Sequence, residues 1–232
     1  MLWVLFHYAY LFLKDVRPRL KGNKLKAFQH LTKKERRILV IGDLHEPFCL
    51  DGYLEFCQDT YAKWNCNQVI FIGDIIDNHY SSYHESDPNG MGGGDELDLA
   101  IKKVAKWSKA FPKADVLIGN HDRIIMRKAF SSAIPKEWIK SYNEVLGTKW
   151  NWCESIVYDD VLFEHGEGGQ AKTKARNNMQ VGCGVDADTY AAAYAKNFKK
   201  QAIGCGVILG GHTAINVLMP LGKPKPKPTT VL

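Results

Sequence analysis

Cysteine is scarce in this chain of 232 residues, and no two cysteines form a C-x-x-C pair. The six are Cys49, Cys57, Cys66, Cys153, Cys183 and Cys205. So few cysteines exclude a disulfide-stapled fold, and their spacing argues against a zinc knuckle. We therefore expect six reduced thiols, which is typical of an intracellular protein and predicts a cytoplasmic location.

A long hydrophobic run is also missing. The most apolar stretch, MLWVLFHYAYLFL at residues 1–13, is too short to span a bilayer. A secretory signal peptide would place positive charge before its apolar run, whereas Lys14, Arg17 and Arg19 follow this one. Three alternatives stay open: a segment that packs on the domain or on a partner chain, an anchor that gives peripheral contact with a membrane, or an extension with no structural role.

Excess positive charge is absent from most of the chain. The net charge is +6, but residues 1–40 carry ten basic and two acidic side chains and so contribute +8. The rest of the chain carries 21 basic and 23 acidic side chains, a net charge of −2. A body with this balance is not a basic nucleic-acid-binding domain, so nucleic acid is a possible but not a favoured partner.

These shifts in composition divide the chain into three parts. At 45% hydrophobic residues, the chain has enough apolar material for a sizeable core. We expect an apolar and then basic extension over residues 1–37, one domain over residues 38–221, and a disordered Pro/Lys tail over residues 222–232.

Apolar runs alternate with helical patterns in the first half of the domain. Strands are predicted over residues 37–42, 68–73 and 115–119, and helices over residues 51–64 and 95–110 with Asp51 and Asp95 as N-caps. Three apolar runs separated by helical patterns indicate a βαβαβ unit with a parallel core, and hence an α/β fold.

The second half of the domain gives weaker signals. Helices are predicted within residues 122–146 and 187–198. Residues 155–166 predict a hairpin that turns at Asp159-Asp160, or two short strands. Residues 206–219 predict two strands joined by a Gly-Gly-His-Thr turn.

Each of the three predicted strands ends in a glycine followed at once by metal-ligand residues: GDLH, GDIIDNH and GNHD. In open α/β sheets, ligands bind outside the carboxyl ends of the strands. Asp43 and His45 are two residues apart, so they lie on one side of an extended backbone and can hold one ion. Asp74 could bridge two ions, and Asn120 offers a neutral oxygen. Mixed nitrogen and oxygen ligands suit Mn, Fe or Zn.

Three further residues complete the candidate site. His121 follows Asn120 and therefore points elsewhere, which suits a general acid better than a metal ligand. Asp77 could accept a hydrogen bond from His121 and keep it protonated. His165 follows the apolar Val-Leu-Phe run and has small glycine neighbours that would admit a substrate.

The ordered blocks GDLH, GDIIDNH, GNHD, EHGE and GHT resemble the calcineurin-like metallophosphoesterase family, in a small phage or bacterial type. The family pattern is D-x-H, G-D-x-x-D, G-N-H-D/E, H and a final G-H-x-H. The resemblance implies a β-sandwich of two mixed sheets flanked by helices, in four layers. It also implies a hydrolase that uses two divalent metal ions (Mn, or Fe/Zn) to activate water against phosphate esters.

The resemblance assigns ligands to each ion. It implies that Asp43 and His45 bind the first metal, that Asp74 bridges the pair, and that Asn120 and His165 bind the second. The same pattern gives the histidine after the asparagine the role of proton donor, oriented by the second aspartate of G-D-x-x-D.

The chain departs from the family pattern in two places. The last block reads Gly211-His212-Thr213-Ala214, so His212 is a candidate ligand without the usual second histidine. Alternatively the true block is missing and His212 only looks like it, since similar small members carry G-H-x-H before a stretch such as VGCGVD. The protein phosphatases of the family have arginine where this chain has Asn78, which argues against a close protein phosphatase.

Three functions therefore stay open. A metal-dependent phosphoesterase is the favoured hypothesis. The alternatives are a nuclease or phosphodiesterase on the same scaffold, or a degenerate metal-binding homologue without catalysis. A narrow site would favour monoesters and an open groove would favour nucleic acid. The Gly-rich loop after Asp77 could be a substrate lid with Tyr80 and Tyr83 as contacts, or a solvated loop.

Overall fold

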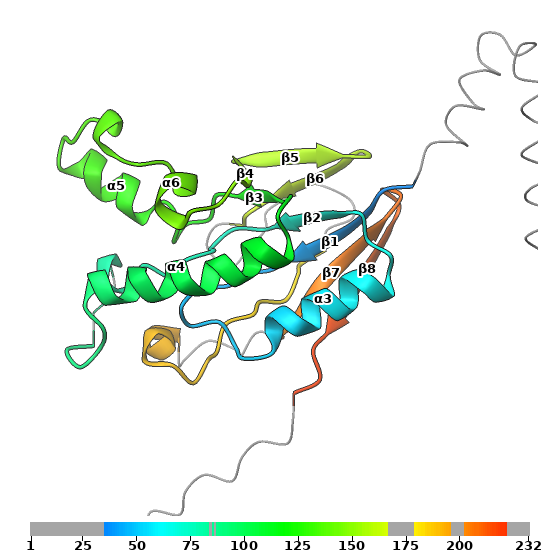
Figure 1. Cartoon of the computed structure of the whole chain (residues 1–232), viewed down its shortest axis with the longest axis horizontal. Helices are drawn as coiled ribbons and strands as arrows, with labels where there is room; N and C mark the ends of the chain where they lie inside the picture. The colour runs from blue at the N-terminus through cyan, green and yellow to red at the C-terminus, as the bar shows by residue number, and fades with distance from the viewer. Residues whose placement is uncertain (1–34, 84, 86, 167–178, 196–201, 222–232) are drawn as a thin grey trace, which may run out of the picture. The chain divides into compact units, whose positions relative to one another are not determined.

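Four parallel strands form the centre of the domain (Figure 1). The computed structural model describes residues 35–83, 85, 87–166, 179–195 and 202–221. The parallel strands are β1 (Arg37–Ile41), β2 (Gln68–Phe71), β3 (Asp115–Leu117) and β4 (Asn151–Cys153). Two antiparallel strands, β7 (Gly204–Leu209) and β8 (Thr213–Leu218), extend the sheet in the order β4-β3-β2-β1-β7-β8. The predicted parallel core is confirmed.

Helices α3 (Tyr53–Lys63) and α4 (Gly93–Ala110) cover one face of this sheet. Leu39 and Ile41 of β1 point to that face and pack with Tyr53 of α3 and Trp107 of α4, all at most 2% exposed. The predicted N-caps are wrong: the caps are Gly52, in the left-handed region at φ 85°, and Gly92.

A second sheet covers the other face. It is the hairpin of β5 (Ser155–Tyr158) and β6 (Val161–Glu164). Its Phe163 packs against Ile38 and Val40, which alternate along β1 with the residues of the helix face. The hairpin turns at Asp159 and Asp160 with φ of 50° and 63°, as predicted and as a tight hairpin turn requires. The expected architecture, two sheets flanked by helices, is confirmed, although among the described residues the second sheet has only these two antiparallel strands.

Short helices fill the connections. They are η2 (His79–Ser81), α5 (Ile124–Ser131), η3 (Lys136–Trp138), α6 (Tyr142–Leu146) and η4 (Tyr190–Ala195). We call the stretch from α5 to α6 the arm; it follows β3 and leads into β4.

Within the described residues, no helix is long and apolar enough to cross a membrane. All six cysteines are free thiols, as expected from their spacing. The apolar and basic extension predicted for residues 1–37 lies outside the described residues as far as residue 34, and so does the tail predicted for residues 222–232.

Candidate metal centre

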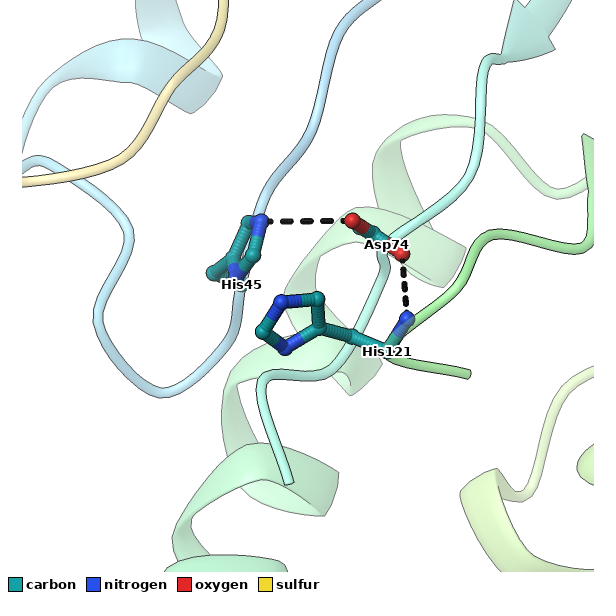
Figure 2. A group of neighbouring side chains, drawn as sticks. All are labelled: His45, Asp74 and His121. Carbon is teal, nitrogen blue, oxygen red and sulfur yellow. Dashed lines mark hydrogen bonds and ion pairs between the residues drawn. The ribbon is translucent and has the colours of Figure 1, made fainter. Parts of the chain in front are cut away.

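The loops after β1, β2 and β3 meet at the carboxyl ends of these strands. The backbone N–H groups of Leu44 and His45 both donate to the Asp74 carbonyl, at 3.1 and 2.9 Å. The His121 N–H donates to Asp74 Oδ1 at 2.8 Å (Figure 2). His45 and Asp74 both have φ of 49°, so each loop bends sharply straight after its strand. Three loops that are distant in sequence therefore share Asp74.

Nitrogen and oxygen atoms from four residues converge in this space. Asp74 Oδ2 lies 3.5 Å from His45 Nε2 and 3.5 Å from His165 Nε2. His165 Nε2 lies 2.8 Å from Asn120 Oδ1. Nitrogen and oxygen atoms that bind one ion at about 2.1 Å lie about 3–3.5 Å apart, so this spacing suits a shared cation.

The other nitrogen of each imidazole is held by the protein. His45 Nδ1 donates to Asp77 Oδ1 at 2.5 Å, and His165 Nδ1 donates to the Ile72 carbonyl at 2.9 Å. Carbonyl and carboxylate oxygens can only accept, so both Nδ1 atoms carry hydrogen, and the Nε2 atoms, which face Asp74 and Asn120, are the ones that could bind a ligand. Histidines that bind metals are usually oriented by such bonds. The donor set therefore fits a divalent cation.

Negative charge also accumulates here. Burial and the charge of Asp74 raise the pKa of Asp43, whose Oδ1 lies 4.0 Å from His165 Nδ1. Burial alone would raise the pKa of Asp74, but the neighbouring imidazoles, with His45 first, lower it to about 2. Burial would lower the pKa of His45, yet the carboxylates of Asp74 and Asp77 raise it well above its usual range. In place of that proton, a cation could balance the same carboxylates.

His121 lies closer to the cluster than its place in the sequence suggests. Ligand-type atoms of His45, Asp74 and His121 all lie within 4.8 Å of one another, and the rings of His45 and His121 meet edge to face at 4.3 Å. The expected partner, Asp77, contacts both imidazoles. Its backbone carbonyl accepts from His121 Nδ1 at 2.6 Å, while its carboxylate lies 3.5 Å from that nitrogen and 2.5 Å from His45 Nδ1.

Sequence reasoning gave no role to Asp122, the last residue of the GNHD block. This carboxylate is 1% exposed and accepts from the N–H groups of Gly119 and Asp74 at 2.9 Å and of Ile75 at 3.0 Å. Burial, followed by the charge of Asp74, raises the pKa of Asp122 to about 7. Asp122 thus ties the loop after β3 to the loop after β2. The sequence signal that could have identified Asp122 was its position in the GNHD block.

The structure does not bring His212 to the cluster. Strand β7 runs antiparallel to β1, with Leu209 opposite Arg37, so the turn after β7 lies beside the start of β1 (Figure 1). The Gly210 N–H accordingly donates to the Arg36 carbonyl. His212 is exposed there and bonds only within the turn, to Thr213. The prediction of His212 as a metal ligand is therefore wrong, and the remaining candidate ligands lie at the carboxyl ends of the strands and at His165.

Comparison with known proteins agrees with the geometry. Residues 36–216 match the model of the family described as calcineurin-like phosphoesterase, which covers most of the chain and every residue of the cluster. No curated protein matches the chain.

Proposed function

Because the chain belongs to the calcineurin-like phosphoesterase family, whose members hydrolyse phosphoesters with the help of metal ions, we propose that it hydrolyses phosphate esters at the cluster around Asp74. The observation that carries the proposal is the convergence of His45 Nε2 and His165 Nε2 on Asp74 Oδ2, each at 3.5 Å, with Asn120 Oδ1 beside His165 Nε2 at 2.8 Å. The cytoplasmic location of the protein stays a prediction.

The family resemblance supplies the proposed ligand set. Asp43 and His45 would hold a first divalent ion, Asn120 and His165 would hold a second, and Asp74 would contribute to both. Mn²⁺, or an Fe/Zn pair, fits the mixed oxygen and nitrogen donors. When bound, such ions polarise the phosphoryl oxygens and lower the pKa of water.

The protein's own residues then manage the proton. Hydrolysis forms a bond from the water oxygen to phosphorus and breaks the bond to the alcohol oxygen, which must gain a proton. His121 supplies this proton in our proposal, since the Asp77 carbonyl at 2.6 Å from Nδ1 keeps its ring fixed. Asp77 also orients His45 through its carboxylate, so it acts by positioning both imidazoles.

The direct test is hydrolysis of p-nitrophenyl phosphate and bis-p-nitrophenyl phosphate with added Mn²⁺, with and without a chelator. We expect turnover of at least one ester that the chelator abolishes. Comparison of the two esters separates a monoesterase from a diesterase. If neither ester is turned over, the protein is instead a metal-binding homologue without catalysis, which the loss of the final histidine block would explain.

A further inference from the structure

The Asp77 carboxylate has one more imidazole beside it than the proposed mechanism uses. Its Oδ1 accepts from His45 Nδ1 at 2.5 Å and lies 3.5 Å from His121 Nδ1. Its Oδ2 accepts no hydrogen bond among the described residues, but His79 Nδ1 lies 3.9 Å from it, within ion-pair distance. Three histidine rings from three segments of the chain therefore surround one carboxylate that is only 3% exposed.

The ring of His79 is held in place by its neighbours. It is 6% exposed and meets Phe48 edge to face at 6.5 Å and Tyr190 edge to face at 5.4 Å. The backbone N–H of His79 donates to Glu96 Oε1 at 2.7 Å. Packing and this bond fix the position of the ring, which is what a residue that supports a functional site requires.

The groups that face the two ring nitrogens of His79 show where its hydrogen lies. Nε2 has no hydrogen-bond partner among the described residues, whereas Nδ1 faces the ionised Asp77 carboxylate, which can only accept. A hydrogen on Nε2 alone would turn the Nδ1 lone pair toward that carboxylate, and two facing acceptors repel each other. A hydrogen on Nδ1 is present in the other neutral tautomer and also in the imidazolium, so both of these forms attract Asp77 Oδ2.

A second contact matters to Asp77 for a physical reason. The terminal torsion of an aspartate side chain is broad, so contacts at Oδ1 alone do not fix the plane of the carboxylate. Attraction at Oδ2 limits this rotation, and Oδ1 then stays in line with His45 Nδ1. A buried charged oxygen without any partner would also be costly for the folded chain.

We infer that His79 is a positioning residue for the proposed reaction. Its Nδ1–H attracts Asp77 Oδ2 and thereby holds the carboxylate that orients His45 and lies beside His121. The inference rests on the proposed function, because it assigns a role within that same site. His79 contacts neither substrate nor metal, so its effect reaches the reaction through Asp77.

The competing role for His79 is packing alone, and two substitutions separate the two roles. If only the contacts with Phe48 and Tyr190 matter, a phenylalanine would serve as well as the histidine. His79→Phe keeps a ring and removes the N–H, whereas His79→Asn loses the ring and keeps an N–H donor near the place of Nδ1. His212→Ala, which changes an exposed histidine outside the cluster, is the control.

The kinetic test uses the full chain with Mn²⁺ and the p-nitrophenyl ester that the parent hydrolyses. We expect His79→Phe to lower kcat by about 10–100-fold with little change in KM, as is usual when an outer partner of a metal-binding imidazole is lost. His79→Asn should retain most of the parent kcat, and His212→Ala all of it. In an Asp77→Asn background, His79→Phe should lower kcat further by no more than about twofold, since both changes remove the same contact.

A spectroscopic readout does not depend on turnover. The proton that His45 Nδ1 donates to the buried Asp77 carboxylate should resonate far downfield in the proton NMR spectrum of the full chain with diamagnetic Zn²⁺. Labelling with ¹⁵N-histidine, and loss of the signal in Asp77→Asn, would identify it. We expect this signal to shift or broaden in His79→Phe, to stay in His79→Asn and to be unchanged in His212→Ala.

Two results would overturn the inference, each in variants whose circular dichroism matches the parent. One is a parent kcat and a parent NMR signal in His79→Phe, and the other is an equal loss in His79→Phe and His79→Asn.

Failure of the proposed function gives a different result. If the parent hydrolyses no ester in a chelator-sensitive way, the phosphoesterase is rejected, and the NMR signal alone decides whether His79 positions Asp77. Chelator-sensitive turnover that His79→Phe leaves unchanged would reject the role of His79 and keep the phosphoesterase.

Discussion

Single hydrogen bonds orient the imidazoles of the candidate metal centre. The Nδ1 atoms of His45, His121 and His165 each face an acceptor of the protein: the Asp77 carboxylate, the Asp77 carbonyl and the Ile72 carbonyl. All three rings are therefore fixed in one orientation with Nε2 turned away from these partners. Ligands that are held in advance lose little conformational entropy when they bind.

Gly119 is the residue whose size matters most here. A Cβ at this position would overlap Asp74 Oδ1, which must stay in place to accept from the His121 N–H. We expect Gly119→Ala to lower Mn²⁺ occupancy and ester hydrolysis at least tenfold, measured by metal analysis and steady-state kinetics. Gly94→Ala, where a Cβ meets nothing within 4 Å, is the control and should retain both. Full occupancy in Gly119→Ala would contradict the geometry.

His121 is expected to affect the rate more than the metal content. Removal of a general acid usually lowers kcat by about 10²–10⁴-fold. We expect His121→Ala to show that loss while each chain retains its metal, which metal analysis of the purified variant would check. A variant with parent activity would remove His121 from the mechanism, and a variant without metal would make it a ligand.

At the scale of elements, α4 supports the loop that follows Asp77. Its Glu96 is 4% exposed, and its carboxylate accepts from the N–H groups of His79 at 2.7 Å and Tyr80 at 3.1 Å. These bonds hold η2, which follows Asp77 and carries His79. One helix thus supports the residue that we propose to position Asp77.

We therefore expect Glu96→Ala to destabilise the protein and loosen η2. The loss of two hydrogen bonds to a buried carboxylate should lower the free energy of unfolding by about 1–3 kcal/mol, measured by urea denaturation. Asp98→Ala is the control, because Asp98 lies on the opposite side of α4 and is exposed. Its free energy of unfolding should stay within about 0.5 kcal/mol of the parent value. Equal stability of the two variants would show that Glu96 does not hold η2.

At the scale of the whole molecule, metal binding and stability are linked. When the concentration of free ion is 100 times its dissociation constant from the folded chain, ion binding adds about 2.7 kcal/mol to the free energy of unfolding. For a domain of this size, that corresponds to a rise of about 5–10 °C in Tm. The proposed ligands come from loops after three strands and from the residue after β6, so one bound ion would join segments distributed across the fold.

We expect added Mn²⁺ to raise Tm by this amount and a chelator to reverse it, as followed by thermal denaturation. Asp74→Ala should abolish the shift, because Asp74 contacts both halves of the proposed ligand set. Asp188→Ala, outside the cluster, is the control and should retain the shift. A shift that persists in Asp74→Ala would place the stabilising ion elsewhere.

Much of the metal centre could be predicted from short motifs. Asp43, Asp74 and Asn120 each come two or three residues after a strand, and parallel strands place such residues at one edge of a sheet. The hairpin turn at Asp159-Asp160 could also be predicted, because the residues that favour such a turn are adjacent in the sequence.

Features that depend on strand direction or on distant contacts could not be predicted. His212 follows an apolar strand and glycine, as Asp43, Asp74 and Asn120 do, but β7 runs antiparallel to β1 and carries His212 to the opposite edge. Asp122 acts through backbone groups of another loop. His79 meets Phe48 and Tyr190, and no local pattern shows that these three segments lie together.

The antiparallel direction of β7 has a practical consequence for immobilising this protein on a surface. The turn at Gly210, Gly211 and His212 lies at the edge of the sheet opposite the metal centre, and His212 is exposed there. A linker attached through this turn would fix the domain to a sensor surface or a bead with its reactive edge facing the solution. Immobilised in this way, the molecule would present every residue of the cluster to incoming substrate.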